Sequence, residues 1–573
     1  MECNVHIGSK FVTHRTLFGL ALILLGTTIA AQQPAAPDKP TTFSSRTELV
    51  TVPVIVNDKS GKHMTGLKQT DFTLEENGHR REIANFEEIT TTAAPLKPRP
   101  AAQYEFSNFI PSDGQTRRVT IIVVDLLNTP FLYQARARAE IVKFLSNHLQ
   151  DNGPTALNVL NRNGLRPVHS FTTDTSVLIA ALNKLKSNIS TQDELATGAF
   201  VNPESSNALD DPSSTEASQL LEIMNQRADA DFGAYKQRIQ TLTTLDALDQ
   251  IAQSYAGIPG RKTLIWATGG LPFLLNDPDS VTGIDTTLMD NYQRTWRALN
   301  AAEIAVYPVD AQGLLGPDLS QRAMSARSRP PAMTQASRTG VRAPTPLPVD
   351  PRQNAQDSLR AFAHSTGGHP CINQNDLATC FARAEEDSSQ YYLLSYYLPS
   401  DDRKPGWRKL KVQVAGAHGE IRARDGFYVG DNPAPDSKRA RNELQLAYSS
   451  PLAFTAVPME VHIAKAAPAE NNTRKVSFDL HFPANSISIA APDNAIGLDI
   501  EAIATDEKGK SVRVFAKTIS AHLKPESLPG VNKNGFRLAE ELVIAKGHYQ
   551  LLFVVRDDGN GKIGTLGAPL QVD

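Results

Sequence analysis

The sequence predicts an α/β domain with a doubly wound, Rossmann-like sheet, inserted into a β-sandwich and followed by a second, C-terminal β-sandwich. Three observations lead to this fold class. Apolar runs alternate with helical periodicity over residues 116–388, which is typical of parallel sheets covered by helices. Strand-like alternation flanks this region at 42–90 and 389–430, and each flank alone supplies too few strands for a sandwich. Residues 446–573 show only strand alternation and hairpin turns.

The first 31 residues are predicted to be an export signal. Lys10 and Arg15 precede the apolar run TLFGLALILLGTTIA, and small residues follow, so cleavage is expected after Ala30 or Ala31. The run is shorter than the about 20 residues that a spanning helix needs, and an uncleaved anchor is the alternative. No later segment has the length and apolarity of a span. We therefore expect an exported protein that is secreted, periplasmic or at the cell surface.

The first part of the split sandwich is predicted from local pattern. The stretch RTELVTVPVIVND has an alternating pattern through Val50, Val52, Val54 and Val56. Farther along, Asn77–Gly78 lies between two strand-like arms, which is a strong hairpin signal. Segments 91–115 and 431–445 are predicted linkers, the first of them rich in Pro and Ala.

Within the α/β region, VTIIVVD, TLIWAT and IAVYPVD are continuous apolar runs of buried-strand type, and a helix is expected to begin at Pro130. Residues 313–356 are rich in Pro, Arg and Ser. This insert is read either as a disordered loop with solvated charge or as an arm that binds a polyanion. A formal net charge of −3 over 573 residues does not favour a nucleic-acid partner.

Three polar residues follow directly from these buried strands. Asp125, Thr268 and Asp310 each stand at a predicted carboxyl end, and Asn128 and Gly269 lie in the loops that follow. Ligands of open α/β sheets bind beyond the carboxyl ends of the strands. These five positions are therefore the candidate binding rim.

The order of these motifs resembles the von Willebrand factor A (VWFA) domain, specifically its divergent bacterial group of secreted proteins. The resemblance rests on VTIIVVDLLNTPF, KTLIWATGG, IAVYPVDAQG and AFAHSTGGHP followed by NDLATCFARAEEDSSQYYLLSYYLP, with GLKQTDFTLEENGHRREIANFEE before them. It covers roughly residues 45–430. It implies a Rossmann-like domain that binds proteins at its strand ends.

The resemblance also implies a metal-ion-dependent adhesion site for Mg²⁺, with a first loop D-x-S-x-S. Asp125 and Thr129 match that loop, whereas Leu127 replaces its first serine and Gly269 replaces the third-loop aspartate. Thr191 is a candidate second-loop hydroxyl. A site so reduced would bind Mg²⁺ weakly and mostly through water. The alternative is a structural corner, in which the Thr129 hydroxyl caps the helix and Asp125 accepts backbone N–H groups.

The mature chain is expected to contain two cysteines, Cys371 and Cys380, because Cys3 would leave with the signal. An even pair at short spacing in an exported protein suggests a disulfide that closes a small loop. The alternative is that both cysteines are buried, unpaired thiols.

The leading functional hypothesis is an exported, non-catalytic protein that binds a protein partner or acts in adhesion, with no certain cofactor. The motivating observation is that the chain is built of binding-type modules and that the sequence contains no H-E-x-x-H, G-x-S-x-G or Walker loop. The alternatives are a structural spacer in a cell-envelope assembly and a metal-assisted hydrolase that uses the rim. The sequence does not identify the partner.

Overall fold

The computed structural model describes residues 48–96, 104–109, 115–147, 153–185, 216–270, 286–313, 351–398, 404, 406–416, 419–429, 438–464, 466–470, 473–490 and 493–573. The expected signal at 1–31, most of the expected insert at 313–356 and the candidate ligand Thr191 lie outside these residues. Among the described helices, none combines the length and apolarity needed to cross a membrane.

A five-stranded sheet forms the centre of the α/β region. Its order is β10-β9-β6-β7-β8, with β10, β9, β6 and β7 parallel and β8 antiparallel to β7. The strands are β6 (Val119–Asp125), β7 (Thr155–Asn161), β8 (Gly164–Thr172), β9 (Lys262–Thr268) and β10 (Ile304–Asp310). Every residue of β6, β9 and β10 is buried. Burial on both faces accounts for their continuous apolar runs.

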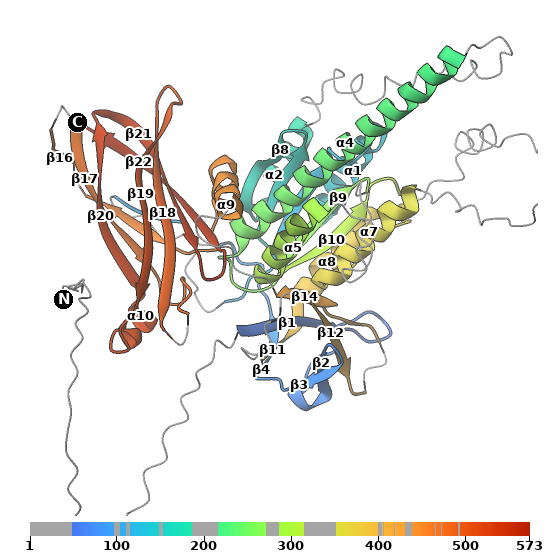
Figure 1. Ribbon diagram of the computed structural model, residues 1–573. Coiled ribbons are helices and arrows are strands. Elements are labelled where there is room, and N and C mark those ends of the chain that lie inside the picture. The colour runs from blue at the N-terminus through green and yellow to red at the C-terminus, as the bar shows by residue number, and fades with distance from the viewer. Residues whose placement is uncertain are drawn as a thin grey trace, which may run out of the picture. The chain divides into compact units, whose positions relative to one another are not determined.

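Helices cover both faces of this sheet (Figure 1). The core on one face contains side chains of α4 (Glu216–Tyr255), α5 (Thr286–Ala301) and α7 (Pro351–Thr366). The core on the other face contains side chains of α1 (Phe131–Asn147), α2 (Thr175–Leu185) and α8 (Leu377–Ser389). Successive side chains of a strand point to opposite faces of the sheet, so the residues of each strand alternate between the two cores.

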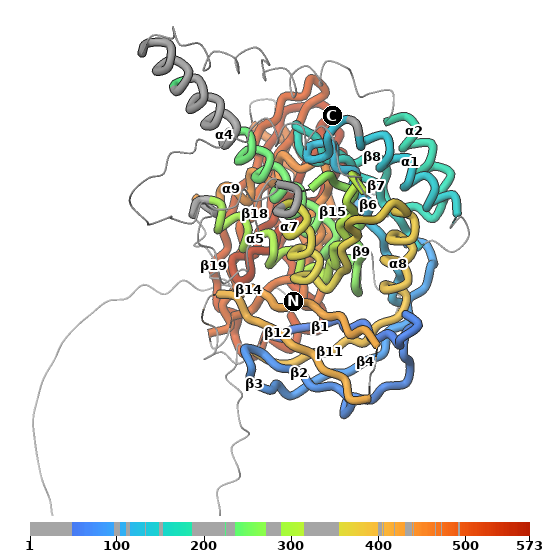
Figure 2. Tube along the Cα trace, turned by 90° about the vertical axis from the view of Figure 1, so that its right-hand side faces the viewer, coloured from blue at the N-terminus to red at the C-terminus, as the bar shows by residue number. Residues whose placement is uncertain are grey.

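A split β module is built from two distant segments, residues 48–90 and 390–429. Its sheets are β13-β1-β11-β4 and β14-β12-β2-β3, and their facing side chains share one core. Blue and orange strands therefore lie side by side in Figure 2. The elements are β1 (Glu48–Val56), η1 (Gln69–Asp71), β2 (Phe72–Glu76), β3 (His79–Arg81), β4 (Asn85–Thr90), β11 (Gln390–Leu398), β12 (Gly406–Val414), β13 (Ile421–Arg422) and β14 (Gly426–Val429).

The hairpin predicted at Asn77–Gly78 joins β2 and β3. Both residues have positive φ, 48° and 80°, as a tight two-residue turn between strands requires. The α/β segment therefore follows β4 in the chain and precedes β11, which is the strand that pairs with both β1 and β4.

A second two-sheet sandwich contains the C-terminal residues. Its sheets are β16-β17-β15-β5, extended by β20 on β17, and β19-β18-β21-β22, with one core between them. The elements are α9 (Lys438–Ser449), β15 (Glu460–Ile463), β16 (Ala467–Pro468), β17 (Thr473–Phe482), β18 (Ala495–Asp506), β19 (Ser511–His522), α10 (Leu528–Asn534), β20 (Phe536–Ala545), β21 (Gly547–Asp557) and β22 (Ile563–Val572).

Both expected linkers contain secondary structure. Within 91–115, β5 (Glu105–Ser107) forms a strand that pairs with β15, so this part of the linker belongs to the C-terminal sandwich. Within 431–445, α9 begins at Lys438, and Ala440 and Leu444 on its apolar face are buried. Both expectations of a plain linker were therefore wrong, because each segment buries apolar side chains against a distant part of the chain.

Candidate functional site

The three predicted strand ends lie next to one another. Asp310 at the end of β10 is the register partner of Thr268 at the end of β9. The Thr268 hydroxyl in turn donates to Asp125 at the end of β6, over 2.9 Å between Oγ1 and Oδ2. We call these residues, together with Asn128 and Gly269, the strand-end rim.

Asp125 is completely buried, and four hydrogen bonds from neutral donors reach its carboxylate. The Asn128 backbone N–H donates to Oδ1 over 2.9 Å, and the Asn128 side-chain amide donates to Oδ2 over 2.8 Å. Trp266 Nε1 and the Thr268 hydroxyl also donate to Oδ2, over 3.1 and 2.9 Å. Burial raises the pKa of Asp125, and these donors partly offset the rise by stabilising the charged form. Each carboxylate oxygen thus already accepts a hydrogen bond.

The loop that follows β6, the first loop, is held by α4 as well as by Asp125. The Asn128 side-chain amide donates to the Thr244 hydroxyl over 2.9 Å as well as to Asp125. The Thr129 hydroxyl is buried and has no hydrogen-bond partner among the described residues, so the expectation that it caps the helix was wrong. The N–H group that Asp125 accepts is that of Asn128, before the helix begins. The corner is therefore stabilised by Asp125 and Asn128.

Gly269 packs directly against this first loop. A Cβ atom at Gly269 would lie 2.7 Å from Pro130 Cδ and 2.8 Å from the Asn128 carbonyl oxygen. Real Cβ contacts are not that short, so no larger side chain fits at this position without movement of the loop. The aspartate that the adhesion-site pattern would place here is excluded by the same contact.

These observations test whether the residues fit Mg²⁺. An adhesion-type site needs oxygen ligands with free lone pairs that converge on one point. Asp125 is surrounded by hydrogen-bond donors, Leu127 packs against the core, and Gly269 leaves no room for a carboxylate. No group of three or more His, Cys, Asp or Glu side chains suited to a metal ion occurs in the described part of the chain. The rim does not fit the metal.

Asp310 is also engaged by its neighbours. Its Oδ1 accepts the backbone N–H of Gln312 over 2.9 Å, and its Oδ2 accepts Gln356 Nε2 over 3.2 Å. Gln356 also donates to Asn373 Oδ1 over 2.9 Å. Asp310 therefore links β10 to α7 and to the loop that follows α7.

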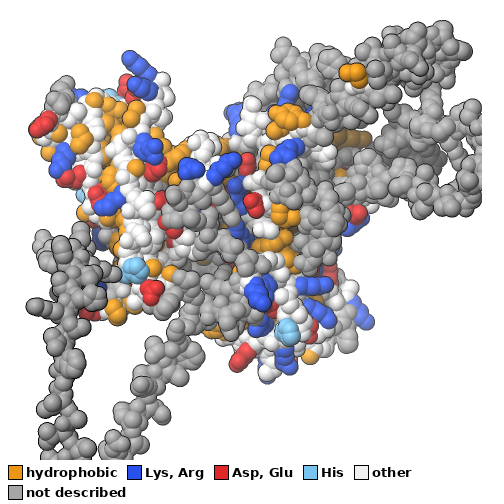
Figure 3. All heavy atoms as spheres, in the orientation of Figure 1, with side chains coloured by type: hydrophobic (Ala, Val, Ile, Leu, Met, Phe, Trp, Pro, Cys, Tyr) orange, Lys and Arg blue, Asp and Glu red, His pale blue; other side chains and the backbone are white. Residues whose placement is uncertain are grey.

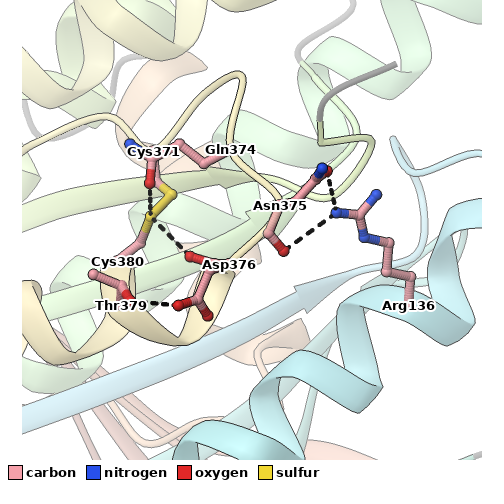
Figure 4. The surroundings of a disulfide bond; sticks show 7 residues. All are labelled: Arg136, Cys371, Gln374, Asn375, Asp376, Thr379 and Cys380. Atoms are coloured by element: carbon pink, nitrogen blue, oxygen red, sulfur yellow. Dashed lines mark hydrogen bonds between the residues drawn. A yellow bond between two sulfur atoms is a disulfide. The ribbon is translucent and has the colours of Figure 1, made fainter. Parts of the chain in front are cut away.

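That loop is closed by a disulfide between Cys371 and Cys380, the bridged form of the two alternatives (Figure 4). Cys371 lies beside the end of β10, because its carbonyl oxygen accepts a hydrogen bond from the Asp310 N–H over 2.8 Å. We call residues 371–380 the disulfide loop. Five polar side chains of this loop are exposed: Asn373, Gln374, Asn375, Asp376 and Thr379.

Arg136 on α1 holds the disulfide loop next to the rim. Its guanidinium donates to Asn375 Oδ1 over 2.9 Å (Figure 4). It also donates to the Gln312 carbonyl over 3.3 Å. Gln312 in turn donates to the Gly269 carbonyl. One chain of hydrogen bonds therefore connects the exposed loop to the buried rim.

Sequence reasoning missed Trp266, Arg136, Gln312 and Gln356. Trp266 had a usable signal, because it precedes Thr268 by two residues and so faces the same side of β9. No sequence pattern marks the other three, since their partners come from remote elements. Thr191 cannot be placed, because it lies outside the described residues.

Known proteins add little to this description. No protein-family model matches the sequence, and no curated protein matches it. Among solved structures, the chain is similar to the pilus adhesin SpaC from Lactobacillus rhamnosus GG, with 8% identity and a TM-score of 0.25. The match covers 90% of this chain and 60% of the adhesin chain, so this chain spans less than two thirds of the adhesin. Similarity of this size assigns neither fold nor function.

The surface chemistry is mixed. On the face drawn in Figure 3, basic and acidic side chains are interspersed and neither sign forms a large patch. This face therefore offers no large region of one charge to a strongly charged partner such as a nucleic acid.

Proposed function

We propose that this chain is an exported, non-catalytic protein of the VWFA-related group that binds a protein partner in an adhesion-type role. The proposal combines the strand-end position of the rim with the resemblance of its motifs. The partner contacts the exposed disulfide loop, which the buried strand-end rim holds in place. Binding does not require a metal ion, because the Asp125 oxygens are already committed to donors.

The observation that carries the proposal is the disulfide loop. It presents five exposed polar residues, and its two ends are fixed by the Cys371–Cys380 bridge. Hydrogen bonds from Arg136 and Gln356 fix the loop further. A loop that is ordered before binding loses little conformational entropy on binding. Exposed polar groups in a fixed arrangement also supply specificity.

The test is capture of a partner from cell-envelope extract, followed by affinity measurement with the purified partner. Gln374→Arg places a long cation on the exposed loop and touches no buried contact. Gln413→Arg, at an exposed position of β12 in the split β module, is the matched control. We expect at least tenfold weaker binding for Gln374→Arg, wild-type affinity for Gln413→Arg, and no effect of a chelator.

Other results would contradict the proposal in different ways. Binding that survives Gln374→Arg would place the interface elsewhere, and loss of binding in chelator would restore a metal-dependent site. Failure to capture any partner would favour the spacer. Turnover of a hydrolase substrate panel that is lost in Asp125→Ala would replace the binding role with an enzymatic one.

A further inference from the structure

One strand of the C-terminal sandwich comes from a distant part of the chain. β5 precedes β6 in the sequence, yet it pairs antiparallel with β15 in the register Glu460↔Ser107, Val461↔Phe106 and His462↔Glu105. Its main packing contacts are with β15 and β22. In Figure 1 it is the blue ribbon among the orange and red strands of the sandwich. A segment of the N-terminal half thus completes a C-terminal sheet.

Two side chains of this segment contact the C-terminal sandwich, and two neighbouring side chains do not. Phe106 packs against the core of the sandwich, whereas Glu105 and Ser107 are exposed. Asn108 Nδ2 donates to the carbonyls of Phe454 and Val457, both over 3.0 Å. Asn108 Oδ1 accepts the Met459 N–H over 2.8 Å. The segment is therefore a Phe-x-Asn motif that binds at the edge of the sheet formed by β15.

The backbone adds to this recognition. The Asn108 N–H donates to the Met459 carbonyl over 3.2 Å, and the Ile463 N–H donates to the Tyr104 carbonyl over 3.0 Å. Without β5, the sheet would end at β15, and these groups would lose their partners. Met459 and Val461, now at most 1% exposed, would lose the cover of the segment. An unpaired edge beside apolar side chains is a template for another strand.

We propose that β15 is a strand-accepting edge for extended Phe-x-Asn segments, and that residues 104–109 of a second copy of this chain are its alternative occupant. A second copy presents the same segment and would make every contact that the first copy makes. Residues 104–109 pack on the C-terminal sandwich through their own side chains, so the same contacts form whichever copy supplies them. Exchange of an identical element between copies has a low cost for this reason.

Within one chain, the attached segment has the advantage of a high effective concentration. Exchange is therefore expected to increase with protein concentration and to be largest when the segment of the accepting chain is disabled. Strand exchange would connect the N-terminal half of one copy to the C-terminal sandwich of the next.

The first experiment uses the full chain with Phe106→Ala and Asn108→Ala, which empties the edge, and a fluorescent YEFSNF peptide. We expect saturable peptide binding to this variant at least tenfold tighter than to the wild-type chain, whose edge is filled. A YEASAF peptide should not bind. A second variant, Glu105→Ala with Ser107→Ala, changes only exposed positions and should exclude the peptide as the wild type does.

The circular dichroism spectrum of each variant establishes that it is folded, and Asn108→Ala alone serves if the double variant does not fold. No binding to a folded variant with the edge emptied would overturn the strand-accepting edge. Equal binding to the wild type would also overturn it, because β5 would then not occupy the edge.

The second experiment tests the second copy. Ser107→Cys and Glu460→Cys are introduced in separate chains, both with Cys3→Ser, so that a new disulfide between these register partners can form only between two copies. We expect a covalent heterodimer whose yield rises with concentration, and at least a fivefold lower yield when the Ser107→Cys chain also carries Phe106→Ala and Asn108→Ala. Lys508→Cys, on the exposed β18–β19 turn, is the control partner. No heterodimer at about 0.5 mM would exclude the second copy as occupant.

Discussion

Two buried carboxylates near opposite ends of the same sheet are held in different ways. Asp125, at the carboxyl end of β6, accepts only neutral donors. Asp387, on α8, forms a two-pronged ion pair with Arg422 of β13 and also accepts the Tyr307 hydroxyl over 3.0 Å. Arg261, just before β9, donates to the Asp387 carbonyl over 3.0 Å and to the Tyr307 hydroxyl over 2.9 Å.

The difference separates a cluster held by opposite charges from a cluster held by neutral hydrogen-bond donors. The Asp387 cluster joins the α/β region to the split β module through opposite charges that are nearly excluded from water. The Asp125 cluster joins two strand ends and the first loop through dipoles alone. Burial raises the pKa of Asp125 and the neutral donors offset part of that rise, so the carboxyl group is held in the rim by hydrogen bonds and not by a cation.

The largest effect is expected at the charged cluster. Asp387→Ala removes the two-pronged partner of the buried Arg422 guanidinium and leaves only the partly exposed Glu420, 3.3 Å from Arg422 Nε, as its counter-charge. It should lower the free energy of unfolding by about 3–5 kcal/mol. Urea denaturation measures this loss. The matched control is Asp357→Ala, which removes an exposed pair with Arg360 and should change stability by about 0.5 kcal/mol or less. Equal losses for the two variants would show that the Asp387 cluster stabilises the fold no more than an exposed ion pair does.

Asp249 on α4 is an intermediate case between these two carboxylates. Its Oδ2 lies 3.4 Å from Arg294 Nε, while its Oδ1 has no hydrogen-bond partner among the described residues. Burial raises the pKa of Asp249 from 3.8 to about 6; Arg294 opposes the rise, and Asp246 and Glu443 add to it. The folded protein therefore binds this proton more tightly than the unfolded chain does.

It follows that Asp249 should make the protein less stable as the pH rises. Its unfavourable contribution is absent below about pH 3.8, grows up to about pH 6 and is constant above, and amounts to at most about 3 kcal/mol. Urea denaturation at several pH values measures this slope. Asp249→Asn should flatten the slope in that window, and Asp357→Asn should not. An unchanged slope in Asp249→Asn would assign the pH dependence to other groups.

At the neutral rim, two substitutions of Asp125 should differ. Asp125→Ala leaves the Trp266 and Asn128 donors buried without an acceptor, and should cost about 2–3 kcal/mol of stability. Asp125→Asn keeps an acceptor oxygen and removes a buried charge, and should cost about 1 kcal/mol or less. Thermal and urea denaturation compare the two. A cost for Asp125→Asn as large as that for Asp125→Ala would mean that the negative charge itself is needed.

The sequence was most informative where local pattern and burial agree. The runs at 119–125, 262–268 and 304–310 are strands because continuous apolar sequence fits a sheet that is covered on both faces. Asn77–Gly78 is a hairpin because two adjacent residues there must adopt positive φ. These features depend on neighbouring residues alone.

Long-range contacts could not be read in the same way. β5 is three residues long, too short for an alternating pattern, and its partner β15 is more than 350 residues away. The Thr129 hydroxyl was expected to cap a helix, yet Asn128 makes the decisive contacts because the loop turns toward Asp125 and α4. Trp266 could have been placed by strand period, whereas Arg136 and Gln356 depend on how remote elements pack.

The most direct test of the metal-free rim is the melting temperature of the mature protein in increasing Mg²⁺ or Mn²⁺, with NaCl at matched ionic strength. A ligand that binds only the folded protein raises its stability in proportion to RT ln(1 + [L]/Kd). We expect no saturable rise beyond the NaCl control up to about 10 mM metal, in the wild type or in Asp125→Asn. A saturable rise in the wild type that Asp125→Asn abolishes would contradict a rim held by neutral donors.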